Sequence, residues 1–220
     1  VQNVVANDSA ISSTNNVTGI LLSTGVTNSS LTRNNVSGVR YTGSSGYGGK
    51  GIDINTSRAA SNLTVANNFV SDVRGDGWNS LAGDSVVGLR INGATGGVTL
   101  VYNSVNLGYG TFAGNSSGTL SAAFYADAST SGLTVRNNIF ATNLVNSAAA
   151  TAKSYAIATT ATSSALFSAI NINDYYPSGT QGVLGQLNAV DRTTLAAWQT
   201  ATGQDAGSIA ADPLFVSATD

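Results

Sequence analysis

One feature constrains the fold of this chain more than any other: amides, mostly in adjacent pairs, recur at the ends of apolar runs at a nearly constant interval. The phrase LTVRNNIF spans Leu133 to Phe140, and LTRNNV, LTVANNFV and VTLVYNSV are related to it. The second amide of each phrase is the marker, and the series is Asn35, Asn68, Asn103, Asn138 and Asn173. Successive markers lie 33, 35, 35 and 35 residues apart. This interval indicates a solenoid built from one repeated unit.

A second marker precedes each amide by 15 to 17 residues and keeps step with it. It is a small residue that opens a short apolar run, at Gly19, Gly51, Gly88, Ala123 and Ala156. Asp8 extends the amide series upstream. Each unit therefore consists of a strand, a polar turn, a second strand that ends at the amide, and a variable loop rich in Gly and Ser. Such a unit buries its apolar face only by stacking on its neighbours.

Stacking gives the repeated amides a structural purpose. Equivalent strands of successive units run parallel about 4.8 Å apart, so identical positions lie above one another. Asn tolerates the left-handed turn conformation, and its side chain both donates and accepts hydrogen bonds. A column of Asn can therefore satisfy backbone groups at a bend that would otherwise stay unpaired. We expect an asparagine ladder along the solenoid.

Composition excludes several classes of function. Charged residues make up 9% of the chain, and the net charge of −2 argues against nucleic-acid binding, which needs clustered Lys and Arg. No run of 18 apolar residues is present, so we expect no transmembrane segment. The chain has no Cys and no His, which excludes disulfides, thiolate zinc sites and a Ser-His-Asp triad. Because it also has no Met, we expect it to be a piece of a longer protein.

The repeated phrases and the terminal ADPLFV, Ala211 to Val216, resemble right-handed parallel β-helix repeat proteins of the pectin-lyase-like fold. The preceding TTLAAWQTATGQDAGSIA resembles the late part of secreted bacterial β-helix proteins. The resemblance implies one all-β domain over residues 1–220 and an extracellular location, secreted or at the cell surface. The expected coils, about six, are residues 1–18, 19–50, 51–87, 88–122, 123–155 and 156–185.

Residues 186–220 are expected to form one short helix and a terminal strand. Asp191 or Thr193 can cap the start of the helix, and Gly203 can end it. Trp198 falls on the same face as Leu195 and Thr202, so we expect it to anchor the helix over the side or end of the solenoid.

The outward position of the strands that follow the small marker holds possible chemistry. It carries Leu21, Asp53, Arg90, Tyr125 and Ala158 in successive units. Asp53 and Arg90 should be stacked neighbours, either as a partly exposed salt bridge or as part of a polysaccharide cleft. The resemblance implies that lyases of this fold hold calcium on carboxylates while an Arg or Lys abstracts a proton. In this chain Asp53 would be the calcium ligand, and Arg90 or Lys50 would be the base.

The resemblance to these lyases also argues against a metal or cofactor. The outward positions of the strands supply one carboxylate, where those enzymes use several. A hydrolase would need paired carboxyl groups. The available ones, Asp72, Asp76 and Asp84, share one Gly-rich loop whose spacing is first of all typical of turns. We expect no cofactor, and a Ca²⁺ site in this loop has no motif to support it.

The loops that follow the amides should all emerge on one and the same side of the solenoid. They carry aromatic and charged residues that are usual in sugar binding, where rings stack on pyranose faces. With Tyr125 from the strand column, the predicted ligand-binding residues are Arg40, Tyr41, Tyr47, Arg74, Asp76, Trp78, Tyr109 and Tyr125, and Phe112 lies on the same face. Alternatively, Trp78 and Phe112 fold inward and cover the coil beneath their loops.

These patterns favour a non-enzymatic stalk or adhesin that binds a polysaccharide or surface glycan through its loop face. One alternative is a fragment of a polysaccharide lyase or glycoside hydrolase. Another is a purely structural fibre segment, whose coils continue end to end into the parent protein or other copies, because coil ends are unpaired strand edges.

Overall fold

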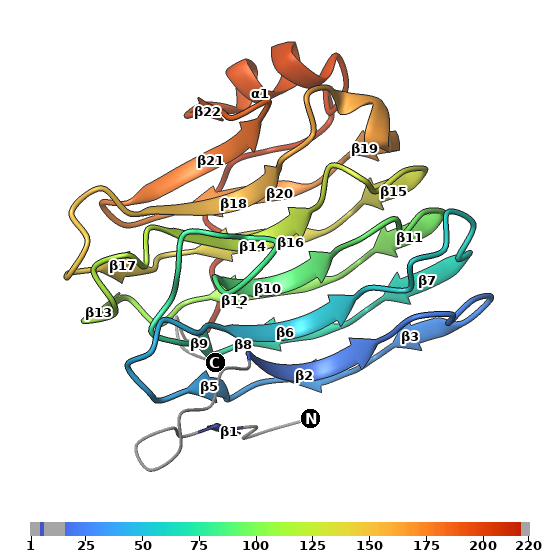
Figure 1. Ribbon diagram of the computed structural model, residues 1–220. Coiled ribbons are helices and arrows are strands. Elements are labelled where there is room, and N and C mark those ends of the chain that lie inside the picture. Colours follow the sequence, from blue (N-terminus) through green and yellow to red (C-terminus); the bar gives the residue numbers. More distant parts are fainter. Residues whose placement is uncertain (1–4, 7–15, 217–220) are drawn as a thin grey trace.

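The computed structural model describes residues 5–6 and 16–216, which form a parallel β-solenoid (Figure 1). Three long sheets run along the stack, and the second and third each contribute one strand per turn. Each of these two has five strands, so the described residues complete about five turns. The all-β parallel solenoid is confirmed. Most of the first expected coil, residues 1–18 with Asp8, lies outside the described residues.

The three long sheets are parallel throughout, apart from the last strand of the first sheet. The first sheet, in order, consists of β2 (Val17–Leu22), β6 (Gly49–Ile54), β10 (Val86–Ile91), β14 (Leu120–Ala126), β18 (Lys153–Thr159), β21 (Gly182–Leu187) and β22 (Val190–Arg192). The second consists of β3 (Ser30–Thr32), β7 (Leu63–Ala66), β11 (Val98–Val101), β15 (Leu133–Arg136) and β19 (Phe167–Asn171). The third consists of β4 (Asn35–Val36), β8 (Phe69–Ser71), β12 (Ser104–Leu107), β16 (Ile139–Thr142) and β20 (Asp174–Pro177).

Loops that follow the third sheet form the loop side of the solenoid, at the left of Figure 1. They contain short strands that pair between turns. One set is β1 (Val5–Ala6), β5 (Val39–Tyr41) and β9 (Val73–Arg74), and the other is β13 (Thr111–Phe112) and β17 (Val145–Asn146). A short 3-10 helix, η1 (Ser164–Leu166), precedes β19. The predicted placement of long loops on one side is therefore confirmed.

Apolar side chains of all three sheets point inward and form one continuous core. In the first sheet, the small marker residue makes room for the third sheet. A Cβ on Gly51 would lie 2.3 Å from Val70 Cγ1 and 2.5 Å from the carbonyl oxygen of Gly88. Both Gly51 and the next residue, Ile52, therefore face the core side. This explains why a small residue recurs at the marker position.

The asparagine ladder is confirmed along most of the stack. Asn68, Asn103, Asn138 and Asn173 are each 2% exposed or less. The Oδ1 of Asn103 accepts from the backbone N–H of Asn68 at 3.1 Å and from its Nδ2 at 2.9 Å. The same two bonds link the next pairs of rungs at 3.0–3.1 Å. Each amide thus satisfies the backbone at the bend of the turn below it.

At the N-terminal end the predicted rung is wrong by one residue. Asn34 occupies the ladder position, and its N–H and Nδ2 both donate to Asn68 Oδ1, at 3.0 and 2.8 Å. Asn35 is instead the register partner of Phe69, in β4. The unit between Asn34 and Asn68 is 34 residues long, one shorter than the others. Apolar pairing decides the register, since Leu31 lies beside Val65 and Val36 beside Val70.

The two amides of each pair have different tasks. The first adopts the left-handed conformation, with φ of 55° at both Asn67 and Asn137, and the second forms the rung. Three turns place another residue at the left-handed position: Arg33, Tyr102 and Ile172, with φ of 57°, 58° and 57°. A β-branched residue such as Ile172 is strained there. The turn geometry therefore comes from the stack as well as from local preference.

A cap covers the C-terminal end of the stack. Helix α1 (Leu195–Thr202) lies over this end (Figure 1), and Gly203 ends it at φ 65°. Its N-cap is Thr194, so the predicted Asp191 and Thr193 are both wrong. Trp198 is fully buried, as predicted for an anchor. Its indole donates to Asp205 Oδ2 at 2.7 Å, and its ring centroid lies 6.2 Å from that of Tyr175.

Candidate functional site

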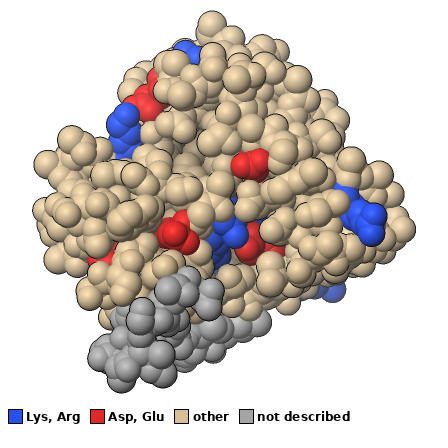
Figure 2. Space-filling model, viewed as in Figure 1, with Lys and Arg blue, Asp and Glu red and all other residues tan. Residues whose placement is uncertain are grey.

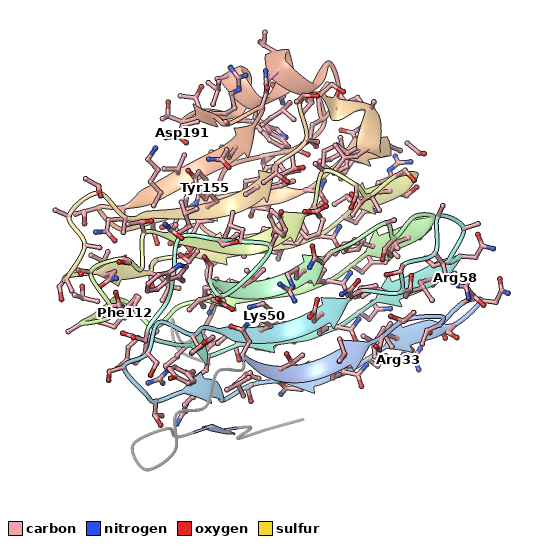
Figure 3. All side chains as sticks on the ribbon, viewed as in Figure 1. Arg33, Lys50, Arg58, Phe112, Tyr155 and Asp191 are labelled. Carbon is pink, nitrogen blue, oxygen red and sulfur yellow. The ribbon has the colours of Figure 1, made fainter. Side chains whose placement is uncertain are left out.

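Two groups of the predicted residues lie in different places. Figure 3 shows Phe112 on the loop side, whereas Lys50 lies on the outer face of the first sheet. Charged side chains are sparse on the face seen in Figure 2, where a small basic and acidic group gathers near the centre. We describe this charged group first and the loop side second.

Asp53 and Arg90 form the predicted pair, as register partners on β6 and β10. The guanidinium binds the carboxylate through two bonds, Nε to Oδ1 at 2.9 Å and Nη2 to Oδ2 at 2.6 Å. Its Nη1 donates to the carbonyl of Ala82 at 2.5 Å. The pair is 5% and 8% exposed, so the expectation of a partly exposed salt bridge is wrong. With its donors occupied in this way, Arg90 ties the 75–85 loop to the sheet, which is a poor arrangement for a proton-abstracting base.

Lys50 is the outward residue three positions before Asp53, and it is fully buried beneath the same loop. Burial, with a smaller contribution from the nearby charge of Arg90, lowers the pKa of its amine to about 7. Among the described residues, its hydrogen bond goes to the carbonyl of Ser85, at 3.2 Å. A lysine in this state holds a nucleophilic neutral amine over much of the physiological pH range.

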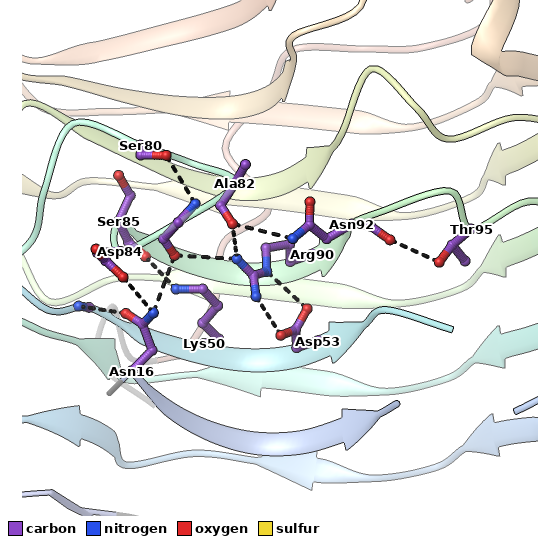
Figure 4. A network of polar contacts seen from close by, with 12 residues as sticks. Asn16, Lys50, Asp53, Ser80, Ala82, Asp84, Ser85, Arg90, Asn92 and Thr95 are labelled. Atoms are coloured by element: carbon purple, nitrogen blue, oxygen red, sulfur yellow. Dashed lines mark hydrogen bonds and ion pairs between the residues drawn. The ribbon is translucent and has the colours of Figure 1, made fainter. Parts of the chain in front are cut away.

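Asn16, immediately before β2, reaches the same place from the neighbouring turn (Figure 4). Its Oδ1 accepts from the backbone N–H of Gly48 at 3.3 Å, and its Nδ2 donates to Asp84 Oδ1 at 2.8 Å. The Asn16 amide therefore spans from the first described turn, across the second, to the loop of the third. In the sequence Asn16 stands out only as the start of an N-x-T match, Asn16 to Thr18, which does not predict these contacts.

The 75–85 loop covers a second apolar cluster on the outer face of the first sheet. Leu81 packs there against Val87, Ala122, Tyr125, Tyr155 and Ala158. Tyr125 is fully buried, and its hydroxyl donates to Asp127 Oδ2 at 3.1 Å. Burial raises the pKa of its phenol to about 12. The structure therefore does not bring Tyr125 to the loop side, where a ligand-binding role was expected.

On the loop side, four of the expected aromatic and basic residues line one pocket. This pocket, about 140 Å³ in volume and called here the Tyr109 pocket, is bounded by Tyr41, Arg74, Gly75, Val86, Tyr109, Phe112 and Leu144. The guanidinium carbon of Arg74 lies 3.7 Å from the centre of the Tyr109 ring. Tyr41 packs edge-on against Tyr47, with ring centroids 5.5 Å apart. Loops from several turns thus converge on one apolar hollow with a basic rim.

Asp72 organises that rim, a role that sequence reasoning missed. Its carboxylate forms ion pairs with both Arg40 and Arg74. Arg40 and Arg74 keep 36% and 29% of their side chains exposed, whereas Asp72 keeps 11%. Two cations therefore share one carboxylate, so the trio carries a net positive charge, and Arg74 is its member that lines the pocket. The left-handed backbone at Asp72, φ 49°, lets its side chain lie between the two strands that carry the arginines.

Asp76 and Trp78 lie outside the Tyr109 pocket. Asp76 Oδ2 accepts from the backbone N–H of Gly46 at 2.7 Å. The Trp78 ring lies against Gly46, where a Cβ would come within 2.4 Å of Trp78 Cε3. Trp78 therefore covers a neighbouring loop, as the inward-folding alternative predicted. Phe112 combines both expectations, because it lines the pocket and also packs against the core.

Among residues 5–6 and 16–216, two features are absent: a cluster of metal-ligating side chains and a long apolar helix. Within them, no three His, Cys, Asp or Glu side chains gather in a way that could hold a metal ion. The described part of the chain also has no helix with the length and apolarity to cross a membrane. No protein-family model, curated protein or solved structure gives a significant match to the chain.

Proposed function

We propose that this chain is a non-enzymatic β-solenoid module that binds an acidic saccharide at the Tyr109 pocket. The observation that carries the proposal is the union in one hollow of three aromatic rings with Arg74, one of two arginines that share the carboxylate of Asp72. We further propose that it acts as a stalk or adhesin, secreted or at the cell surface, in the manner of bacterial proteins of the pectin-lyase-like fold.

The lining of the pocket suits a sugar ring. Tyr109, which is 38% exposed, and the half-buried Phe112 offer flat apolar surfaces, which complement the C–H faces of a pyranose, and the buried Tyr41 completes the lining. At about 140 Å³ the pocket is smaller than the roughly 300–1,000 Å³ typical of small-molecule sites. It would therefore hold one residue of a glycan whose remainder lies along the loop side.

The rim favours an acidic sugar over a neutral one. Arg40 and Arg74 share the carboxylate of Asp72, so a second carboxylate on a ligand would restore local charge balance. Arginine binds carboxylates through two parallel hydrogen bonds, and the bond is strongest where water is partly excluded. Uronic acids supply a pyranose ring and a carboxylate in one residue.

Binding has better support than catalysis. A glycosidase needs two free carboxyl groups about 5–9.5 Å apart across the scissile bond, and Asp72 is already engaged by two arginines. A lyase needs an accessible base, whereas Arg90 is buried and bound to Asp53. Asp72, Asp53 and Arg90 are therefore all engaged in ion pairs, which favours binding over bond cleavage.

The test is binding of oligogalacturonate, followed by calorimetry, with neutral oligosaccharides in parallel. Tyr109→Ala and Arg74→Gln should each weaken binding at least tenfold. Tyr102→Ala is the matched control, since this tyrosine is 60% exposed and lies at a ladder turn. Equal binding by Tyr109→Ala and the parent chain would refute the assignment of the pocket. A panel of acidic glycans without any binder would leave a purely structural segment.

A further inference from the structure

We propose that Lys50 forms a covalent amide bond with the side chain of Asn16, with release of ammonia, and so joins the first two described turns of the solenoid. This modification is independent of saccharide binding, because the two residues lie on the outer face of the first sheet. Three features of the structure support it: the placement of the two groups, the state of the amine, and the contacts of the amide.

The first feature is convergence. Thr18 on β2 is the register partner of Lys50 on β6, and Val87 on β10 is its partner on the other side. The Lys50 amine bonds to the carbonyl of Ser85, while the Asn16 amide bonds to Asp84, the preceding residue. Asn16 also bonds to Gly48, two residues before Lys50. Two consecutive loop residues thus hold the nucleophile and the amide over the same stretch of β6 (Figure 4).

The second feature is the environment of the amine. Lys50 is fully buried, and the charged groups that act on it are Asp53, Arg90 and Asp84. Asp53 and Arg90 neutralise each other through two hydrogen bonds. Burial favours the uncharged amine, which holds the lone pair that attack on a carbonyl requires. Exclusion of water also protects the product bond from hydrolysis.

The third feature is the way in which the amide of Asn16 is held. Its carbonyl oxygen accepts from the Gly48 N–H, which can stabilise the negative charge that develops on this oxygen during attack. Its nitrogen, the leaving group, bonds to the Asp84 carboxylate at 2.8 Å. Asp84 is therefore placed to transfer a proton to that nitrogen.

The step is balanced without any oxidant or co-reactant. The lone pair of Lys50 Nζ attacks Cγ of Asn16, and a tetrahedral intermediate forms with the charge on Oδ1. In this intermediate Nζ and Nδ2 are bound to the same carbon, so Asp84 Oδ1, which lies 2.8 Å from Nδ2 before the attack, can take a proton from Nζ and deliver it to Nδ2. The Cγ–Nδ2 bond then breaks, ammonia leaves, and a secondary amide joins Nζ to Cγ. Asp84 returns to its starting state, so its role is that of a proton-transfer catalyst.

The bond would stabilise a weak part of the fold. Asn16 immediately precedes β2, the first strand of the first sheet. The chain has no cysteine, so a disulfide cannot tie this strand to its neighbour. A cross-link between residues 16 and 50 constrains the unfolded chain in the way a disulfide does.

Intact-mass spectrometry of the folded chain tests the proposal directly. The mass should fall below the sequence mass by that of one ammonia molecule. After trypsin digestion, cleavage at Lys50 should be lost, and a cross-linked species should join the peptide that ends at Arg33 to residues 41–58. Lys153→Met is the matched control, since Lys153 is the other lysine of the chain and is 44% exposed. This variant should lose ammonia as the parent does.

Lys50→Met and Asn16→Ala should retain the full sequence mass, and Asp84→Ala should slow the loss at least tenfold. Full mass in the folded parent chain after prolonged incubation at pH 8 would overturn the proposal. Loss of water, with a cross-link from Lys50 to Asp84, would overturn the choice of Asn16 as the acceptor. Both of these outcomes are measured on the parent chain, so they do not depend on whether a variant folds.

Discussion

Asn103 and Lys50 are both buried polar side chains on the same solenoid, yet their surroundings differ greatly. Asn103 Oδ1 accepts two hydrogen bonds from Asn68, and its Nδ2 donates to Val65 O and to Asn138 Oδ1. Lys50 is aligned with Thr18 on one side and Val87 on the other, and its amine bonds to one carbonyl. The ladder residue recurs in every turn, whereas the lysine occurs at its position once.

This difference separates two reasons for burying a polar group. A repeated amide is satisfied by its own copies, so its burial contributes to stability. A single lysine without such copies costs stability, because its charged form loses hydration that the protein does not replace. A costly buried group that no repeat requires is therefore where chemistry is to be sought. Four predictions test this contrast, from the largest expected effect to the smallest.

The first prediction concerns the free amine of Lys50, and it uses an Asn16→Ala chain in which the proposed bond cannot form. The unfolded chain keeps the lysine proton up to about pH 10.5, while the native state releases it at about 7. The unfolded state therefore binds more protons between these values, so the free energy of unfolding rises with pH across this window. We expect a rise of about 4 kcal/mol from pH 7 to pH 10 in denaturant titrations.

The chain has no His and no Cys to titrate in this window, and the opposing effect of tyrosines such as Tyr125, whose pKa burial raises, is shared by a chain that lacks Lys50. Adding Lys50→Met to the same background should abolish the pH-dependent rise and increase stability at pH 7. A flat profile in the Asn16→Ala chain would mean that Lys50 is charged and solvated in the native state.

The second prediction concerns the ladder. Asn103→Ala should lower the free energy of unfolding by about 3 kcal/mol, since it leaves the buried Asn68 N–H without its acceptor and removes the bonds from Asn103 to the Val65 carbonyl and to Asn138. Asn79→Ala is the control, because Asn79 is exposed, lies outside the ladder and does not have a left-handed backbone. That change should cost less than about 0.5 kcal/mol. Equal effects of the two substitutions would contradict the structural role of the ladder.

The third prediction concerns the turn beside the ladder. Ile172→Asn should raise the free energy of unfolding by about 1 kcal/mol, because Asn adopts the left-handed conformation with less strain. The reciprocal change, Asn137→Ile at φ 55°, should lower it by a similar amount. Thermal melts of the two variants should shift in opposite directions. A shift in the same direction would show that packing around these side chains outweighs backbone strain.

The smallest effect on stability is expected at the loop side. Tyr109 is 38% exposed and belongs to no repeated position, so Tyr109→Ala should change the free energy of unfolding by less than about 1 kcal/mol. The same variant should lose binding of oligogalacturonate. Substitution of a ladder residue should give the opposite result, with lower stability and intact binding of the folded protein. Destabilisation by Tyr109→Ala comparable to that of Asn103→Ala would remove the distinction between the two sides.

The sequence predicted the stack well because its two markers keep step. Counting outward from the small marker correctly placed Asp53 beside Arg90, two residues 37 positions apart in the chain. The count failed at Asn35, where the unit is one residue shorter and apolar pairing, rather than the amide, fixes the register. Periodicity thus predicts neighbours wherever the units have equal length.

Burial and the candidate sites were harder to predict, because they depend on loops that do not repeat. The 75–85 loop packs Leu81 against Tyr125 and supplies the Ser85 carbonyl to the buried Lys50, and neither position has a counterpart in the ladder or the marker. The gathering of Tyr41, Arg74 and Tyr109 was predicted only as a shared face, since pocket shape depends on loop conformation. The N-x-T match at Asn16 did not predict its contacts, because its partners come from residues 48 and 83–84.

The cap formed by Trp198 and α1 has a consequence for how such a chain can change length. The helix closes the stack from one end, and Ser208 terminates the ladder by accepting from the Asn173 N–H at 2.7 Å. If a 35-residue unit were duplicated and inserted below the cap, it would supply its own ladder asparagine. The turns above and below it would present surfaces that match its own. Gene duplication could therefore lengthen the middle of the protein while the closing helix keeps its place.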